Sequence, residues 1–141
     1  MIEGLGRLFN FVPIAAGKLI SLKDCAGITF FCTGNDTFTL KSATTYNGSP
    51  TALAAITRYY ESTATDGSAA WTDSGDLGSP VSAVTIASGT VSFFCDAADL
   101  PAGALYVEVT VGASGLVAAV PHDLLAARTP KNMRILTGSS S

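Results

Sequence analysis

The chain has 141 residues, of which 48% are hydrophobic and only 13% are charged. Soluble domains average about 25% charged residues, so this chain carries roughly half of the usual charge. Such a composition excludes an intrinsically disordered protein, which needs high charge, and a long coiled coil, which is rich in Glu and Lys. The length indicates one domain that buries a core without disulfides or a metal.

The formal net charge of −3 argues against nucleic acid or an anionic membrane as the main partner. No basic residue lies between Arg58 and Arg128, whereas acidic residues recur throughout that stretch. Arg128, Lys131 and Arg134 then follow with no acidic residue after Asp123. This distribution indicates either a solvated basic end or a basic arm that docks on an acidic neighbour.

The three cysteines, Cys25, Cys32 and Cys95, form no CxxC motif, and His122 is the only further soft metal ligand. This odd number and spacing argue against a disulfide framework and against a zinc site. Cys32 and Cys95 lie in apolar runs, so we expect buried thiols in a reduced protein made in the cytoplasm. The apolar stretch 8–17 is too short to span a bilayer and makes a poor signal peptide.

Residues 1–17 come first and are expected to form an apolar arm, because Pro13 interrupts them and no alternation is visible. Short segments with strand character follow, separated by turn signals such as Asn47-Gly48 and Asp66-Gly67. The expected strands are 18–23, 27–33, 37–41, 54–62, 69–73, 81–86, 90–96, 105–111 and 115–120. A turn or two of helix is expected at 49–55 and at 123–127, and an extended tail over 121–141.

This spacing predicts an all-β fold. We expect an antiparallel β-sandwich or barrel-like domain of about eight short strands over residues 18–120, with extended N- and C-terminal arms. The clearest alternation lies at 105–111. Its apolar set should face the core: Leu105, Val107, Val109 and Val111. Its other set should face solvent: Tyr106, Glu108 and Thr110.

The two arms allow two interpretations. Each folds back over the sheet edges of its own subunit, or each reaches onto another subunit, as apolar arms do in assemblies. Under the second interpretation the arms supply the interface. The candidate interface residues are Leu8, Phe9, Phe11, Leu124, Leu125, Arg128, Lys131, Arg134 and Ile135.

The sequence contains no Gly-rich phosphate loop, no GxSxG elbow and no HExxH motif. A catalytic nucleophile would have to use His122 or Cys95. An Asp next in sequence to a His, as Asp123 is to His122, normally points elsewhere, and an apolar strand makes a thiol such as Cys95 inert. Asp66, Asp73 and Asp76 carry the oxygens that calcium prefers, but Asp in turns usually bonds its own backbone. We therefore expect no enzyme, no catalytic residues, no metal, no cofactor and no small-molecule substrate.

One aromatic group remains, formed by Trp71 with Tyr59 and Tyr60. Such a group serves either as a platform for a sugar ring or, more commonly, as packing at the core or edge of a small sandwich. The first alternative makes the protein a carbohydrate-binding module.

Several stretches resemble small virion proteins of tailed phages that infect actinobacteria, and they cover most of residues 24–134. The matching stretches are Cys25-Ala26-Gly27-Ile28-Thr29-Phe30, Thr33 to Leu40, Arg58-Tyr59-Tyr60-Glu61, the Asp66 to Thr72 hairpin, Val120 to Leu125 and Arg128 to Met133. All of these motifs are structural, and none contains a recognisable catalytic residue.

The resemblance implies a capsid decoration or minor capsid protein on the exterior of the virion. Its partners would be the major capsid protein and copies of itself, with a trimer as one option for the homo-oligomer. Low charge suits this role, because burying large contacts then costs little desolvation. A tail-tube or head–tail connector subunit is the alternative within the virion.

Overall fold

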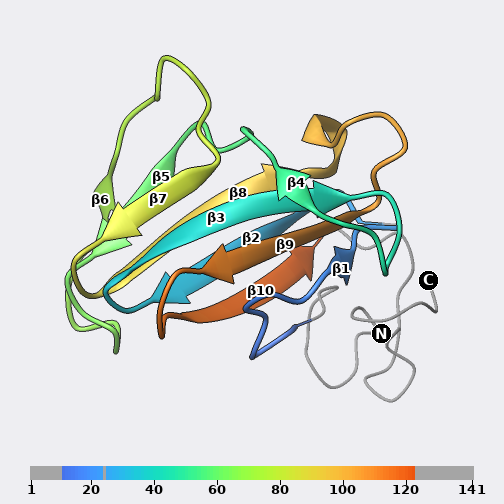
Figure 1. Ribbon diagram of the computed structural model, residues 1–141. Helices are drawn as coiled ribbons and strands as arrows, with labels where there is room; N and C mark the ends of the chain where they lie inside the picture. Colours follow the sequence, from blue (N-terminus) through green and yellow to red (C-terminus); the bar gives the residue numbers. More distant parts are fainter. Residues whose placement is uncertain (1–10, 24, 123–141) are drawn as a thin grey trace, which may run out of the picture.

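The computed structural model describes residues 11–23 and 25–122, and these form ten short strands in two packed antiparallel sheets (Figure 1). The strands are β1 (Ile20–Ser21), β2 (Gly27–Thr33), β3 (Asp36–Ala43), β4 (Thr51–Ala52), β5 (Tyr59–Ser62), β6 (Thr72–Asp73), β7 (Ala83–Ile86), β8 (Thr90–Asp96), β9 (Tyr106–Val111) and β10 (Leu116–His122). The predicted antiparallel β-sandwich is confirmed.

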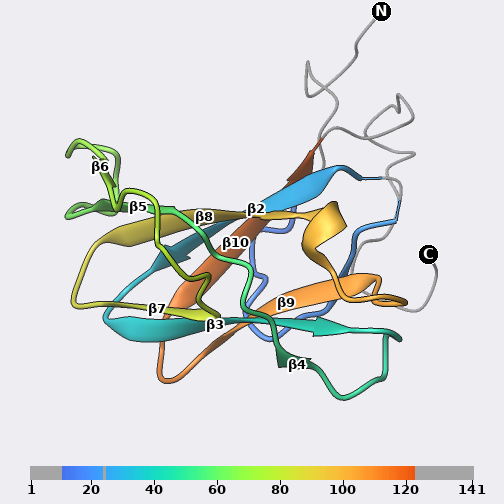
Figure 2. The same cartoon turned by 90° about the horizontal axis from the view of Figure 1, so that it is seen from above.

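The two sheets have five strands each, and we name each after a central strand. The β2 sheet has the order β10-β2-β8-β5-β6. The β3 sheet has the order β1-β9-β3-β4, with β7 also paired to β3. Figure 2 shows the sheets as two layers, and the chain passes repeatedly from one layer to the other. Consecutive strands therefore often lie in opposite sheets.

The core lies between the layers and is built by alternation. In β2 the residues Ile28, Phe30 and Cys32 are buried, while Phe31 points outward. Strand β8 repeats this arrangement, and the rings of Phe30 and Phe93 meet at 5.7 Å between centroids. Because successive side chains on a strand point to opposite faces, each strand contributes one apolar row to the core.

Strand positions agree with the sequence expectation, but several strands are shorter than expected. The helical turn expected at 49–55 is wrong, because Thr51 and Ala52 pair with Ser42 and Lys41 as strand β4. A single 3-10 turn, η1 (Ala97–Asp99), follows β8 instead, capped by the Asp96 carboxylate, which accepts from the Ala98 N–H.

The expectation for 105–111 is half correct. Val107 and Val109 are fully buried, but Tyr106 and Glu108, expected in solvent, are also buried at about 5% exposure. The loop after β3 and residues 17–19 cover the outward side of β9 and together enclose Glu108. Alternation shows which residues share a face, but it does not show whether the second face is covered.

The N-terminal segment 11–17 folds back on its own subunit. Val12 bridges Ala119 of β10, and the Ala15 N–H donates to the carbonyl of Val117. The segment then crosses to the other sheet, where the Gly17 N–H donates to the Val109 carbonyl. It therefore covers the β10 edge and closes one side of the sandwich, which removes a strand edge open to pairing. Residues 1–10 and 123–141 lie outside the described part.

At one end of the sandwich, three connections between the sheets meet. They are residues 34–35 between β2 and β3, 87–89 between β7 and β8, and 112–115 between β9 and β10. The Gly34 N–H donates to the Gly89 carbonyl at 3.1 Å, which joins the first two connections. Gly89 has φ +86°, and a Cβ there would meet the Ser62 carbonyl oxygen, so this close approach requires glycine.

Asp36 joins the first connection to the third. Its side chain accepts the N–H groups of Thr37, Gly112, Ala113 and Gly115 at 2.7–3.0 Å, although Asp36 itself is only 7% exposed. A Cβ on Gly115 would lie 2.9 Å from the Asp36 Oδ2, so glycine is needed for the carboxylate to approach. One carboxylate therefore holds the β9–β10 turn against the start of β3.

Burial alone would raise the pKa of Asp36, but the backbone N–H groups of Gly115, Ala113, Thr37 and Gly112 outweigh it and lower the pKa below its ordinary value. The folded pKa then lies below the unfolded value of about 3.9. The ionised carboxylate therefore stabilises the fold above that unfolded value, and this stabilisation is lost as the pH falls toward the folded pKa.

We expect Asp36→Asn to lower the melting temperature at pH 7 by roughly 5–10 °C. The asparagine amide offers donors where one carboxylate oxygen accepts, so with the NH2 group in place of Oδ2 the Gly115 N–H loses its acceptor and the Ala113 N–H loses one of two. The difference between variant and wild type should shrink as the pH falls below about 4. Thermal unfolding followed by circular dichroism between pH 2 and pH 7 measures both effects.

The matched control is Asp76→Asn, which removes the same charge from an exposed turn. Asp66, whose pKa is lowered by the side-chain and backbone groups of Ser68, keeps some acid sensitivity in both variants. Equal melting temperatures for the two variants at pH 7 would show that the Asp36 carboxylate does not hold the connections together.

Candidate interaction surfaces

Phe11 is the one interface candidate from the sequence that falls within the described residues. It is 49% exposed and precedes Val12, which pairs with the β10 edge. The other candidates lie outside the described residues: Leu8, Phe9, Leu124, Leu125, Arg128, Lys131, Arg134 and Ile135.

The aromatic residues Tyr59, Tyr60 and Trp71 are not buried together. Tyr59 packs against the core, whereas its strand neighbour Tyr60 points to the opposite side and is 42% exposed. A small pocket of about 210 Å³ is lined by Tyr59 but by neither Tyr60 nor Trp71. The three rings therefore do not share one platform.

The cysteines are buried, and two of the aspartates considered for metal binding are bonded to their own backbone turns. Burial raises the pKa of Cys32 and of Cys95 to about 12, and Asp99 and Asp96 add to the effect at Cys95. The expectation of buried thiols is confirmed for these two residues, and Cys25 is buried as well. Asp66 and Asp73 accept from the N–H groups of residues two positions later, as turn carboxylates do. Within the described ranges, no three His, Cys, Asp or Glu residues are placed to hold a metal.

The side of the β2 sheet that faces away from the β3 sheet exposes several large apolar side chains, and we call it the outer face. Strand register aligns two rows across it. The first row begins at the sheet edge with the exposed Asp73 of β6 and continues with Tyr60, Ser92, Phe31 and Ala118. The second is Phe94, Thr29 and Val120. In Figure 2 no described element forms a third layer over β2 and β8.

The outer face combines exposed aromatic rings with few charged residues, which lie at its margins. Phe31 is 38% exposed, Phe94 42% and Leu116, at the end of β10, 66%. Strands β2, β8 and β10 contain a single charged residue, Asp96, which lies at the end of β8. Contiguous apolar surface on a soluble domain marks a site of interaction, whereas single exposed apolar residues do not.

Phe94 is held in place by a glycine on the neighbouring strand. Thr29 lies opposite Phe94, and Gly27 lies diagonally from it on the same face. A Cβ on Gly27 would lie 2.5 Å from the Phe94 ring and 2.8 Å from the Cys95 carbonyl oxygen. The ring therefore lies across the bare backbone of Gly27, which fixes an aromatic surface in the outer face.

The outer face is absent from the candidates drawn from the sequence, although the sequence contains its signal. Phe30-Phe31 and Phe93-Phe94 are adjacent phenylalanine pairs within predicted strands. Because alternate residues of a strand point to opposite sides, one ring of each pair must face outward. Two such strands side by side therefore imply an apolar outer surface.

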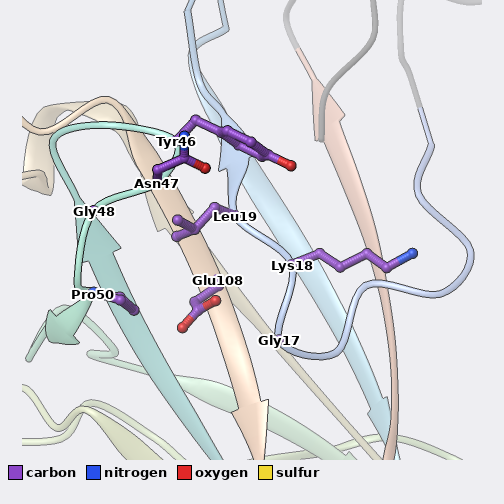
Figure 3. Close-up of a pocket in the computed structure, with 8 residues that line it drawn as sticks. All are labelled: Gly17, Lys18, Leu19, Tyr46, Asn47, Gly48, Pro50 and Glu108. Atoms are coloured by element: carbon purple, nitrogen blue, oxygen red, sulfur yellow. The ribbon is translucent and has the colours of Figure 1, made fainter. Parts of the chain in front are cut away.

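A second surface lies on the other sheet, over the outward side of β9. It is a pocket of about 500 Å³ between the loop after β3 and the segment that precedes β1 (Figure 3). Its lining residues are Gly17, Lys18, Leu19, Tyr46, Asn47, Gly48, Pro50 and Glu108. Burial raises the pKa of Glu108, and the nearby Lys41 partly opposes this shift. The pocket therefore combines a buried carboxyl group with an exposed aromatic ring, that of Tyr46.

Compared with protein-family models, curated proteins and solved structures, the chain has no match. Within the described part of the chain, no helix is long and apolar enough to cross a bilayer.

We expect Cys32 and Cys95 to resist alkylation by iodoacetamide at pH 8 in the folded protein. With a pKa of about 12, the thiolate fraction at that pH is roughly a thousandfold below that of an ordinary cysteine. Mass spectrometry of a Cys25→Ala variant, labelled with and without denaturant, measures the difference. Labelling of both thiols within minutes in the native sample would contradict their burial.

Proposed function

We propose that the protein is a non-enzymatic structural component of a virion, a capsid decoration or minor capsid protein that binds the major capsid lattice and stabilises it. The observation that carries the proposal is the outer face, where the rings of Phe31 and Phe94 are exposed among small side chains and the charged residues Asp73 and Asp96 lie at the margins. The resemblance of residues 24–134 to small phage virion proteins supports a virion as the assembly to which the protein belongs.

The outer face suits a protein partner better than any other class. A β-sheet surface with few charges buries against another protein at low desolvation cost, and aromatic residues are enriched in the centres of such interfaces. The net charge of −3 gives no electrostatic attraction to nucleic acid. The partners proposed are the major capsid protein and other copies of this chain, on the exterior of the capsid.

The mechanism proposed is cementing. Each subunit makes modest contacts, and the symmetry of the lattice repeats them many times. Linked contacts raise the effective concentration of each further contact, so the assembled shell gains stability beyond any single interface. The interface candidates in 1–10 and 123–141, including Arg128, Lys131 and Arg134, would add contacts outside the outer face.

We expect Phe31→Lys to weaken association by roughly tenfold or more. The substituted ammonium group would have to be desolvated in the middle of the row formed by Ser92, Phe31 and Ala118. Analytical ultracentrifugation measures self-association of the purified chain. Co-sedimentation with shells assembled from the major capsid protein of the same virion measures occupancy.

Val81→Lys is the matched control, because Val81 is 36% exposed and bridges Ile56 away from the outer face. Melting curves of both variants confirm that they fold. Unchanged association and unchanged occupancy for Phe31→Lys would overturn the proposal. Rings or tubes of the purified protein in negative-stain images would instead favour a connector or tail-tube subunit, and glycan binding lost in Trp71→Ala would favour a carbohydrate-binding module.

A further inference from the structure

We propose that the pocket over β9 binds a cationic side chain, the guanidinium of an arginine or the ammonium of a lysine, through the carboxylate of Glu108. The site lies on the opposite sheet from the outer face, so this inference does not depend on the function proposed above. It rests on the burial of Glu108, on the placement of its charged neighbours and on the shape of the pocket.

Glu108 is 5% exposed, yet no donor among the described residues forms a hydrogen bond or an ion pair with its carboxylate. Asp36, the other buried acid in the described part of the chain, accepts N–H groups on both of its oxygens. Buried carboxylates are ordinarily satisfied by such donors, because a buried charge without partners is costly. Glu108 therefore retains unused acceptor capacity inside a pocket large enough to admit another group.

The charged and titratable groups around Glu108 leave this capacity open. Lys41 lies directly opposite on β3 and Lys18 lines the pocket, but neither nitrogen lies within 4.0 Å of the Glu108 carboxylate. Figure 3 shows the Lys18 side chain extending away from Glu108. The remaining titratable neighbours are Tyr46, on the pocket wall, and Tyr106, two residues earlier on β9.

The lining fits a cation better than an anion or an apolar group. An anion would meet the Glu108 carboxylate, and an apolar group would leave that carboxylate buried without donors. A guanidinium supplies several N–H donors in one plane, and Tyr46 presents an aromatic ring at the same opening. Burial strengthens the resulting pair, because the surrounding water competes less for the charges.

Two sources supply such a side chain. One is this chain itself, in the same or a neighbouring copy, since Arg128, Lys131 and Arg134 follow β10 without an acidic residue among them. The other is a basic residue of a different protein. Both sources present the same chemistry to Glu108.

The test uses the full chain and follows the carboxyl carbon of Glu108 by NMR during pH titrations. Four samples are compared: the wild type and the variant Arg128→Gln/Lys131→Gln/Arg134→Gln, each with and without N-acetyl-arginine amide. N-acetyl-citrulline amide, which has a similar shape but no charge, is the matched control ligand. Glu108→Gln, which keeps the shape and removes the charge, is the matched control variant.

A cation paired with Glu108 should lower its titration midpoint by about 1 pH unit or more. If the chain supplies the cation, the midpoint rises in the triple variant, and added N-acetyl-arginine amide lowers it again. If another protein supplies it, the midpoint is unchanged in the triple variant, and the arginine compound lowers it in both proteins. In each case the amide signals of Gly17 and Gly48 should shift with the arginine compound and not in Glu108→Gln.

Three results would overturn the proposal. The first is a Glu108 midpoint that responds neither to the triple variant nor to the arginine compound. The second is an equal response to the citrulline compound, because the pocket would then accept uncharged donors. The third is undiminished binding of the arginine compound to Glu108→Gln, because the carboxylate would then play no part.

Discussion

The hydrogen bonds that the Asp36 carboxylate accepts are the interaction on which the arrangement of the two sheets depends. A sandwich whose consecutive strands alternate between layers needs its connections held together, and in this fold three of them meet at one end. Asp36 satisfies N–H groups that a turn between layers leaves without strand partners, and Gly115 lets it approach them. The apolar rows of β2, β8, β3 and β9 then face one another across the core.

Local alternation accounts for most of what the sequence predicts about the fold. Adjacent strands such as 27–33 and 90–96 are predicted at their observed bounds because their apolar rows have a period of two. Which residues are covered by a segment distant in the sequence cannot be predicted from such local patterns. The burial of Glu108 depends on a loop some sixty residues earlier, and Asp36 accepts from a turn 76 to 79 residues later. The two-residue strand β4 is too short to produce any periodic pattern.

The candidate sites also differ in how clearly the sequence indicates them. Apolar arms are the more visible feature of the sequence, yet the described residues 11–17 bond to β10 and β9 of their own subunit. The outer face is less visible because half of each strand's apolar residues belong to the core, so only the paired phenylalanines distinguish the two sides. The Glu108 pocket combines residues from three separate segments, and no single stretch of sequence contains it.

Gly27 has a consequence for how the outer face can evolve. Its missing side chain leaves room for the ring of Phe94 and for the Cys95 carbonyl oxygen, each of which a Cβ would approach within 3 Å. Almost any replacement at this position would displace the ring, the neighbouring strand or both, although the position itself lies in an ordinary extended strand. One glycine thus links the outer face to the spacing of β2 and β8, so a change there would alter the surface and the strand pairing together.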